Sequence, residues 1–316
     1  MSSGVHLNKI EHKLQVMDRN PPPNVKRILR KEVNYGCPVP NCGSPFLSWH
    51  HFDPPWSVKE HHNPEGMIAL CTQCHPMADS GAFSPAQLRC FKQNPNPIEF
   101  VKAKFPWMPE NCIIRLGGCY AQDWCRISIS GEPILEIRKD KVGLTTINFV
   151  LKNESNEILA TMHENVFHAL NDSIHDLAIS ASANRIKIWS EERCIGLEFH
   201  YSRMSATEIE KYIQKDTPVM PDFVGQPVPI ENLKEFYIEL SQIKDFMPEV
   251  AAIGYRRNDP VGTAVRWHVA RHMGEDGRIP LLDFISCRFF HAKQCIELRN
   301  GRLGGLEFCG GNTFSF

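Results

Sequence analysis

Apolar positions recur with two different periods along this chain, and the change of period divides it in two. Residues 6–17 and 25–33 carry apolar side chains three and four positions apart, which predicts amphipathic helices, and the run P-P-P at 21–23 separates them. The stretch S-P-A-Q at 84–87 has the order of an N-cap, a proline at the first helical position and a capping-box glutamine. It predicts the start of a third helix.

Beyond residue 110 apolar residues alternate with polar ones, as antiparallel β-strands with one buried face require. Two helices are predicted between the strands: one opens at the capping box S-A-T-E (205–208), and the other covers 231–246. The alternating segments are 112–116, 125–130, 133–137, 145–151, 158–162, 185–189, 194–201 and 284–298.

A proline-rich stretch at 94–109 separates the two halves and predicts a linker. We therefore expect an α+β protein with two domains, an N-terminal domain (1–110) and a β-rich C-terminal domain (111–316) that contains a few helices. A chain of 316 residues is long enough for each domain to bury a core of its own.

Composition narrows the functional class only a little. Hydrophobic residues make up 42%, charged residues make up 22%, and the net charge is −1, which neither favours nor excludes nucleic acid as a partner. The chain has no apolar run of about 18 residues and no secretory signal, which predicts a cytoplasmic protein without membrane contact. Residues 1–36 hold seven basic against three acidic side chains, and this arm either contacts phosphates or is a solvated helix face.

Twelve cysteines without a secretory signal favour metal binding over disulfides. Two pairs have the spacing of zinc knuckles, Cys37-x4-Cys42 and Cys71-x2-Cys74, with 28 residues between them. Four thiolates complete the tetrahedral shell of a structural Zn²⁺, so we expect one ion here; the alternative is four unrelated buried thiols. The other eight show no such pairing and are expected to pack in cores: Cys90, Cys112, Cys119, Cys125, Cys194, Cys287, Cys295 and Cys309.

The histidines near these pairs carry the sharper signal. His50 and His51 are adjacent, and the period of two in a strand sends their rings to opposite faces, so that one can bind a metal while the other acts as a base. His75 and Asp79 stand four positions apart, and on a helix that starts after Cys74 they share one face. That face offers an imidazole and a carboxylate to the same ion.

The segments W-H-H-F-D-P and M-I-A-L-C-T-Q-C-H together resemble the HNH family of nucleases, and the resemblance covers roughly residues 25–92. The family implies a ββα-metal fold, which in many members carries a four-cysteine zinc site at these positions. Matched position by position, His51 falls on the general base, and His50 and His75 fall on metal ligands. Asp79 falls where the colicin-type nuclease toxins place another metal-binding histidine.

The resemblance also implies a reaction, the hydrolysis of phosphodiester bonds in DNA, with RNA not excluded. The family uses one catalytic divalent ion, commonly Mg²⁺ or Mn²⁺ and sometimes Ni²⁺ or Zn²⁺, besides the structural Zn²⁺. Neutral His51 would accept a proton from the attacking water, while the ion would neutralise charge on the phosphorane and the departing oxygen. A backbone carbonyl near 46–49 is expected to orient the His51 ring.

The chain departs from the family pattern at one position. Where the family has a loop asparagine this chain has Gly66, and Asn63 lies three residues earlier. Either Asn63 braces the loop after a shift of register, or the backbone alone holds it. Asp53 is expected to support the site or simply to belong to a turn, and His61 and His62 are expected to be solvated or to face substrate.

Residues 111–316 carry no nucleophile–base motif and no glycine-rich phosphate loop. They are interpreted as a β-rich recognition or oligomerisation module, with an activating ligand, a protein or a second copy of the chain as its partner. Three hypotheses stay open. The chain is an HNH endonuclease of restriction or anti-phage defence, a catalytically silent zinc-binding module for nucleic acid or protein, or a sensor whose nuclease is activated by a ligand.

Overall fold

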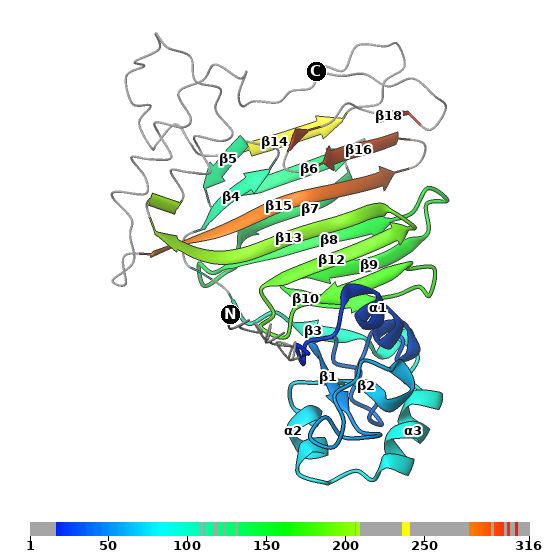
Figure 1. The fold of residues 1–316 in the computed structure, drawn as a ribbon. Helices are drawn as coiled ribbons and strands as arrows, with labels where there is room; N and C mark the ends of the chain where they lie inside the picture. The colour runs from blue at the N-terminus through cyan, green and yellow to red at the C-terminus, as the bar shows by residue number, and fades with distance from the viewer. Residues whose placement is uncertain are drawn as a thin grey trace, which may run out of the picture.

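The computed structural model describes residues 17–107, 109, 112–116, 119–122, 124–129, 132–205, 207–208, 236–240, 278–291, 294–299, 302–303 and 307–308. The described residues form a mixed α+β protein that consists mostly of β-sheet. In Figure 1 a small N-terminal part with short helices lies at one end of a larger body of strands.

The N-terminal part is built around one antiparallel strand pair. The strands β1 and β2 pair in register from Leu47 opposite Cys71 to His51 opposite Met67. Its elements, in chain order, are α1 (Pro23–Glu32), β1 (Leu47–His51), the 3-10 helix η1 (Pro64–Gly66), β2 (Met67–Cys71), α2 (Cys74–Asp79) and α3 (Pro85–Gln93).

Local sequence signals explain these helices. In α1, Val25 and Leu29 are four positions apart and both are buried, as the predicted helix over 25–33 requires. In α3, Ser84 Oγ accepts from the backbone N–H of Gln87, and the Gln87 side chain accepts from the N–H of Ser84, which is the predicted capping box. The predicted helix over 6–17 lies outside the described residues, except for Met17.

The C-terminal part contains two β-sheets whose apolar faces contribute to one core. Phe149 and Phe167 of one sheet and Phe199 and Phe284 of the other belong to the same buried cluster. In the described residues the first sheet runs β14-β6-β7-β8-β9-β10-β3, and the second runs β11-β12-β13-β15-β16-β17, with β4 on β15, β5 on β4, and β18 on β16. The pairs β14/β6 and β15/β4 are parallel and the other pairs are antiparallel.

The strands of the two sheets follow the predicted alternation over most of their length. Their bounds are β3 (Lys102–Lys104), β4 (Ile113–Leu116), β5 (Cys119–Gln122), β6 (Cys125–Ile129), β7 (Glu132–Lys139), β8 (Thr145–Lys152), β9 (Ile158–His163), β10 (Val166–Ala169), β11 (Asp176–Ile179), β12 (Arg185–Glu191), β13 (Cys194–Ser205), β14 (Phe236–Leu240), β15 (Arg278–His291), β16 (Gln294–Arg299), β17 (Arg302–Leu303) and β18 (Glu307–Phe308).

Two predictions about the later elements need correction. The expected helix over 231–246 contains a strand, β14, which pairs in parallel with β6, so its apolar residues suit a sheet edge as well as a helix face. The single strand expected over 284–298 is two strands, β15 and β16, that pair antiparallel. The capping box at 205–208 is present, because Ser205 Oγ accepts from the N–H of Glu208 and Glu208 Oε2 accepts from the N–H of Ser205.

The predicted linker at 94–109 is in part structured. It contains the 3-10 helix η2 (Ile98–Phe100) and strand β3, which pairs with β10 at the edge of the seven-stranded sheet. Val101 and Phe105 are completely buried in the core of the C-terminal part. Apart from Tyr35, which belongs to the C-terminal cluster, the two buried clusters therefore divide between Leu88 and Ile98 rather than near residue 110. Proline is compatible with this structure because β3 is an edge strand.

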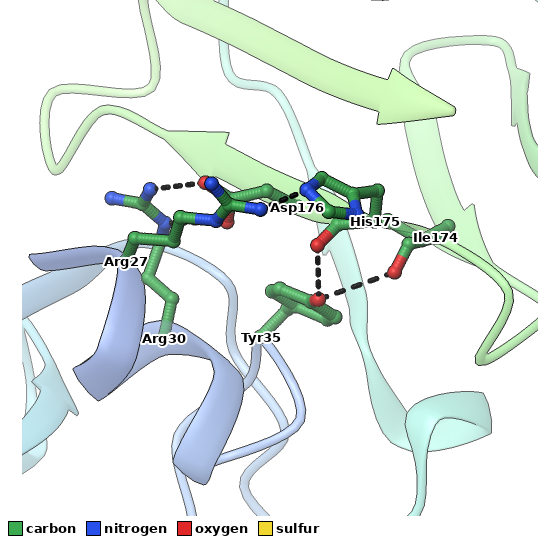
Figure 2. A network of polar contacts seen from close by, with 6 residues as sticks. All are labelled: Arg27, Arg30, Tyr35, Ile174, His175 and Asp176. Carbon is green, nitrogen blue, oxygen red and sulfur yellow. Dashed lines mark hydrogen bonds and ion pairs between the residues drawn. The ribbon is translucent and has the colours of Figure 1, made fainter. Parts of the chain in front are cut away.

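Helix α1 and the turn that follows it join the two parts through polar contacts (Figure 2). The guanidinium of Arg30 donates to both carboxylate oxygens of Asp176, at 3.0 and 2.5 Å, and both side chains are almost completely buried. The phenol of Tyr35 lies 3.2 Å from the carbonyl oxygen of Ile174 and 3.0 Å from that of His175, and Arg27 contacts the His175 ring. A bidentate pair fixes both the distance and the relative orientation of the guanidinium and the carboxylate, so Arg30 and Asp176 hold α1 in a defined position against β11.

Candidate metal centre

The four paired cysteines converge on one point. Cys37, Cys42, Cys71 and Cys74 are all free thiols, and their sulfur atoms lie within 4.8 Å of one another. The Cys42–Cys71 and Cys42–Cys74 sulfur distances are 3.6 and 4.0 Å. A tetrahedral ion with bonds of about 2.3 Å separates its sulfur ligands by about 3.8 Å, so the cluster is compatible with a structural Zn²⁺.

Each cysteine pair sits on a tight backbone turn. In the first turn the N–H of Cys42 donates to the carbonyl of Val39 and the N–H of Gly43 donates to that of Cys37. Gly43 has a φ of +62°, and a β-carbon there would lie 2.2 Å from the carbonyl oxygen of Phe100, so this position requires glycine. In the second turn β2 ends at Cys71 and α2 begins at Cys74, so the cysteine cluster lies at the start of α2.

The predicted ligands His50, His75 and Asp79 also come together. One ligand atom from each residue lies within 4.8 Å of the other two. His50 Nδ1 is 3.1 Å from Asp79 Oδ1, and His75 Nε2 is 3.6 Å from Asp79 Oδ2. The two rings meet edge to face with their centroids 5.2 Å apart.

These atoms have the chemistry of a cation site. Ligands at about 2.1 Å from an ion lie about 3 Å from one another, close to the separations found here. His75 Nε2 is buried and has no hydrogen-bond partner among the described residues, and the buried His50 Nδ1 faces only the Asp79 carboxylate. Burial lowers the pKa of both histidines, so both rings are neutral near pH 7 and keep a lone pair. The donor set fits a divalent cation.

Ser48, which the sequence analysis did not single out, contacts this site. It lies two residues before His50 on β1, and its Oγ is 2.7 Å from Nδ1 of His75 and 3.1 Å from the carbonyl oxygen of Leu70. Alternation along the strand places Ser48 and His50 on the same face, toward α2. That periodicity is the signal that would have found it.

His51 faces the opposite side of β1, as the alternation predicted. Its ring contacts Trp56, with centroids 4.7 Å apart, and lies 5.2 Å from the ring of His61 and 6.0 Å from that of His62. Burial lowers the pKa of His51 to about 4, with smaller effects from the charges of His61 and His62. The ring is therefore unprotonated at neutral pH and covered by the loop that follows β1.

No carbonyl from residues 46–49 orients the His51 ring, contrary to the expectation from sequence. Neither ring nitrogen has a well-formed hydrogen bond with any described residue. The backbone of His61 makes a weaker contact that slightly raises the pKa of His51. Strand geometry explains the difference, because the carbonyl groups of β1 lie in the plane of the strand pair, pointing alternately toward β2 and toward the opposite edge, whereas the side chains project above and below that plane.

His61 is a structural residue, which corrects the prediction that it is solvated or faces substrate. It is buried, its Nδ1 accepts from the N–H of Asn63 at 3.1 Å, and its Nε2 donates to the carbonyl of Pro54 at 2.9 Å. His62 is half-buried and stacks on Trp56. Two backbone contacts leave His61 no free nitrogen for an ion or a substrate.

The position of Gly66 explains the departure from the family pattern. Its carbonyl accepts from the N–H groups of Phe52 and Asp53, and a β-carbon would lie 1.9 Å from the carbonyl oxygen of Asp53. Asn63 caps η1, where its side chain accepts from the N–H of Glu65. The backbone of Gly66 and the cap at Asn63 thus hold this loop together.

The structure also places Asp53 and Arg19. Asp53 is exposed and forms an ion pair with Arg89, as a surface turn residue would. Arg19, from the basic arm, lies close enough for its positive charge to lower the pKa of His50, His51 and His75. Arg19 was counted in the sequence analysis only as part of a charged arm, because nothing local marks it as a neighbour of the histidines.

The eight cysteines outside the four-cysteine cluster agree with the packing prediction only in part. Cys112, Cys125 and Cys287 are buried, but Cys90 is exposed on α3 and Cys194 is half-buried. For Cys90 the error came from treating every cysteine as a buried apolar residue. The side chains of Cys119, Cys295 and Cys309 lie outside the described residues.

Comparison of the chain with models of protein families, with curated proteins and with solved structures gave no match. Among the helices that the structure describes, none is long and apolar enough to cross a membrane.

Proposed function

We propose that this protein is a metal-dependent endonuclease of the HNH type that hydrolyses phosphodiester bonds of DNA. The observation that supports this most directly is the convergence of His50, His75 and Asp79 beside a separate four-cysteine cluster. A structural zinc site needs only its four cysteine ligands, so it does not account for the second cluster of His50, His75 and Asp79. His51 on the reverse face of the same strand supplies a base within one residue of a ligand.

A divalent ion held by His50, His75 and Asp79 would neutralise charge on the scissile phosphate. His51 accepts a proton from the attacking water, because its ring is neutral at pH 7 and has a lone pair without a partner. Trp56 covers that ring and has to move aside before water and substrate reach it. Arg19 contributes positive charge near all three histidines and is suited to contact a phosphate.

The test is cleavage of plasmid DNA, and of RNA in parallel, with Mg²⁺, Mn²⁺, Ni²⁺ or Zn²⁺ present. We expect His51→Ala to reduce the cleavage rate at least about a hundredfold, the range for loss of a general base, with unchanged zinc content. His163→Ala, which removes an exposed histidine on β9, serves as the matched control and keeps full activity.

The proposal fails if the wild-type protein cuts neither nucleic acid with any of these ions, or if His51→Ala cuts as fast as the wild type. The first outcome would favour the rival function, a zinc-binding module that docks nucleic acid or protein without cleaving it. The observation that favours this second function is the contact of the Trp56 ring with the His51 ring, which blocks access to His51. Gel-shift binding by a protein that does not cleave would then support it.

A further inference from the structure

The hydroxyl of Ser48 has only one arrangement of hydrogen bonds that satisfies both of its neighbours. It carries a single proton, and the carbonyl oxygen of Leu70, 3.1 Å away, can only accept. For both contacts to be hydrogen bonds, the proton has to point to Leu70. The Ser48 oxygen then acts only as a hydrogen-bond acceptor toward Nδ1 of His75, which lies 2.7 Å away.

This arrangement determines the tautomer of His75. Its Nδ1 must carry the hydrogen that Ser48 accepts, and a neutral imidazole holds one ring proton, so Nε2 carries none. An imidazole that ligates a metal ion is in its neutral form. Nε2 is the buried atom without a hydrogen-bond partner, and it faces the Asp79 carboxylate at 3.6 Å.

We propose that Ser48 is a positioning residue that fixes His75 in the Nδ1–H tautomer and so directs the Nε2 lone pair into the candidate cation site. The inference rests on the proposed function, because it takes the His50, His75 and Asp79 cluster as the site of the divalent ion. Metal-ligating histidines commonly donate their second ring N–H to an oxygen, and loss of that partner weakens metal binding about 10- to 100-fold. Ser48 fills that role here from the neighbouring strand.

The strand pair holds Ser48 in place for this role. Ser48 lies opposite Leu70 in the β1–β2 ladder, so the carbonyl that takes its proton comes from its cross-strand neighbour. His75 belongs to α2, whose first turn is fixed by the cysteine cluster through Cys71 and Cys74. The structural site thus sets the distance at which Ser48 meets His75.

The experiment compares isosteric side chains in the full-length protein. Ser48→Thr keeps the hydroxyl, Ser48→Val has the same shape as Thr without it, and both are favourable in a strand. We expect Ser48→Val to bind Mn²⁺ at least about tenfold more weakly than the wild type by titration calorimetry, and Ser48→Thr to stay within about threefold. Ser80→Ala, which removes a hydroxyl bonded to Met77 after α2, is the matched control and is expected to bind as the wild type does.

A second measurement reads the tautomer itself. Long-range ¹H–¹⁵N spectra of zinc-loaded protein without Mn²⁺ are expected to show the His75 ring protonated at Nδ1 in the wild type and in Ser48→Thr, and as a mixture of tautomers in Ser48→Val. Equal Mn²⁺ affinity in Ser48→Val and wild type would overturn the inference and leave the proposed function standing. A wild type that binds no Mn²⁺, Mg²⁺ or Ni²⁺ beyond its zinc would overturn both.

Discussion

Gly66 is the residue at which this chain differs from the family that its histidines resemble. The structure gives the difference a steric cause, since the carbonyl of Asp53 occupies the place of a β-carbon and two N–H groups converge on the Gly66 carbonyl. An asparagine at this position would have to push the loop after β1 away from β2. The loop is held at the neighbouring Asn63 instead, through its cap on η1.

Replacing Gly66 by Asn is therefore expected to destabilise the protein and not to improve its site. We expect a loss of about 3 kcal/mol in the free energy of unfolding, because the backbone has to shift to admit any β-carbon. Urea denaturation measures it. Gly81→Asn is the control, since Gly81 has a φ of +81° with open space around it and asparagine tolerates that conformation. Equal costs at the two glycines would contradict the steric argument.

At the residue scale, sequence reasoning placed the ligands better than their surroundings. The side of β1 on which His50 and His51 lie, and the shared face of His75 and Asp79, follow from the periods of a strand and a helix. The burial of His61 and the approach of Arg19 depend on how a loop and an arm fold back, and no local pattern encodes that. For Ser48, the alternation along β1 predicts the face of the strand on which it lies, but not its contact with His75.

Helix α1 is the element that connects the two parts of the molecule. Apolar residues on one face, Val25 and Leu29, anchor it in the N-terminal core, and Arg30 on its last turn reaches Asp176 at the start of β11. At its end Glu32 pairs with Lys92, whose ammonium also lies 3.1 Å from the carbonyl of Met67. The helix thereby connects the β-rich part to the loop and strand that carry the candidate site.

Substituting Arg30 by Met is expected to lower the free energy of unfolding by about 3–5 kcal/mol, because it leaves the Asp176 carboxylate buried without its partner. The double variant Arg30→Met, Asp176→Leu is expected to recover most of that loss, since it removes both charges. Urea denaturation followed by circular dichroism measures both. Lys31→Met, an exposed change on the same turn, should be neutral. A double variant as unstable as Arg30→Met alone would refute the desolvation argument.

Helix α1 was predictable from the spacing of its buried apolar residues, and the start of α3 was predictable from its capping box. Elements were mispredicted where one apolar pattern suits two structures. Residues 231–246 have helical spacing, yet Phe236–Leu240 forms β14, because pairing with β6 decided between the two periods. Residues 94–109 are rich in proline, yet β3 fits between the prolines at a sheet edge.

The part of the chain that the structure describes contains two buried clusters of very different size. The N-terminal cluster is small and is closed by the four cysteines, whereas the C-terminal cluster draws on both sheets. A small core of this kind depends on a metal in many proteins, and a structural Zn²⁺ contributes on the order of 10 kcal/mol to such a domain.

Replacing Cys71, one of the four candidate zinc ligands, by Ser is accordingly expected to unfold the N-terminal part while the sheets stay folded. Hydrogen exchange followed by mass spectrometry should show loss of protection over residues 36–93 and retained protection over 132–205. Cys90→Ser, an exposed cysteine of the same part, is the control and should change neither. Uniform loss of protection across both parts would mean that the sheets depend on the N-terminal core.

The sequence alone determined the chemical groups and their local geometry: two cysteine pairs, two histidines on opposite faces of a strand, and a helix face with His75 and Asp79. These follow from spacing along a few residues, where backbone geometry leaves little choice. Only the tertiary structure decided that Gly66 admits no side chain, that Ser48 holds His75, and that α1 is seated on β11. Each of those depends on contacts between segments far apart in the chain, which spacing does not specify.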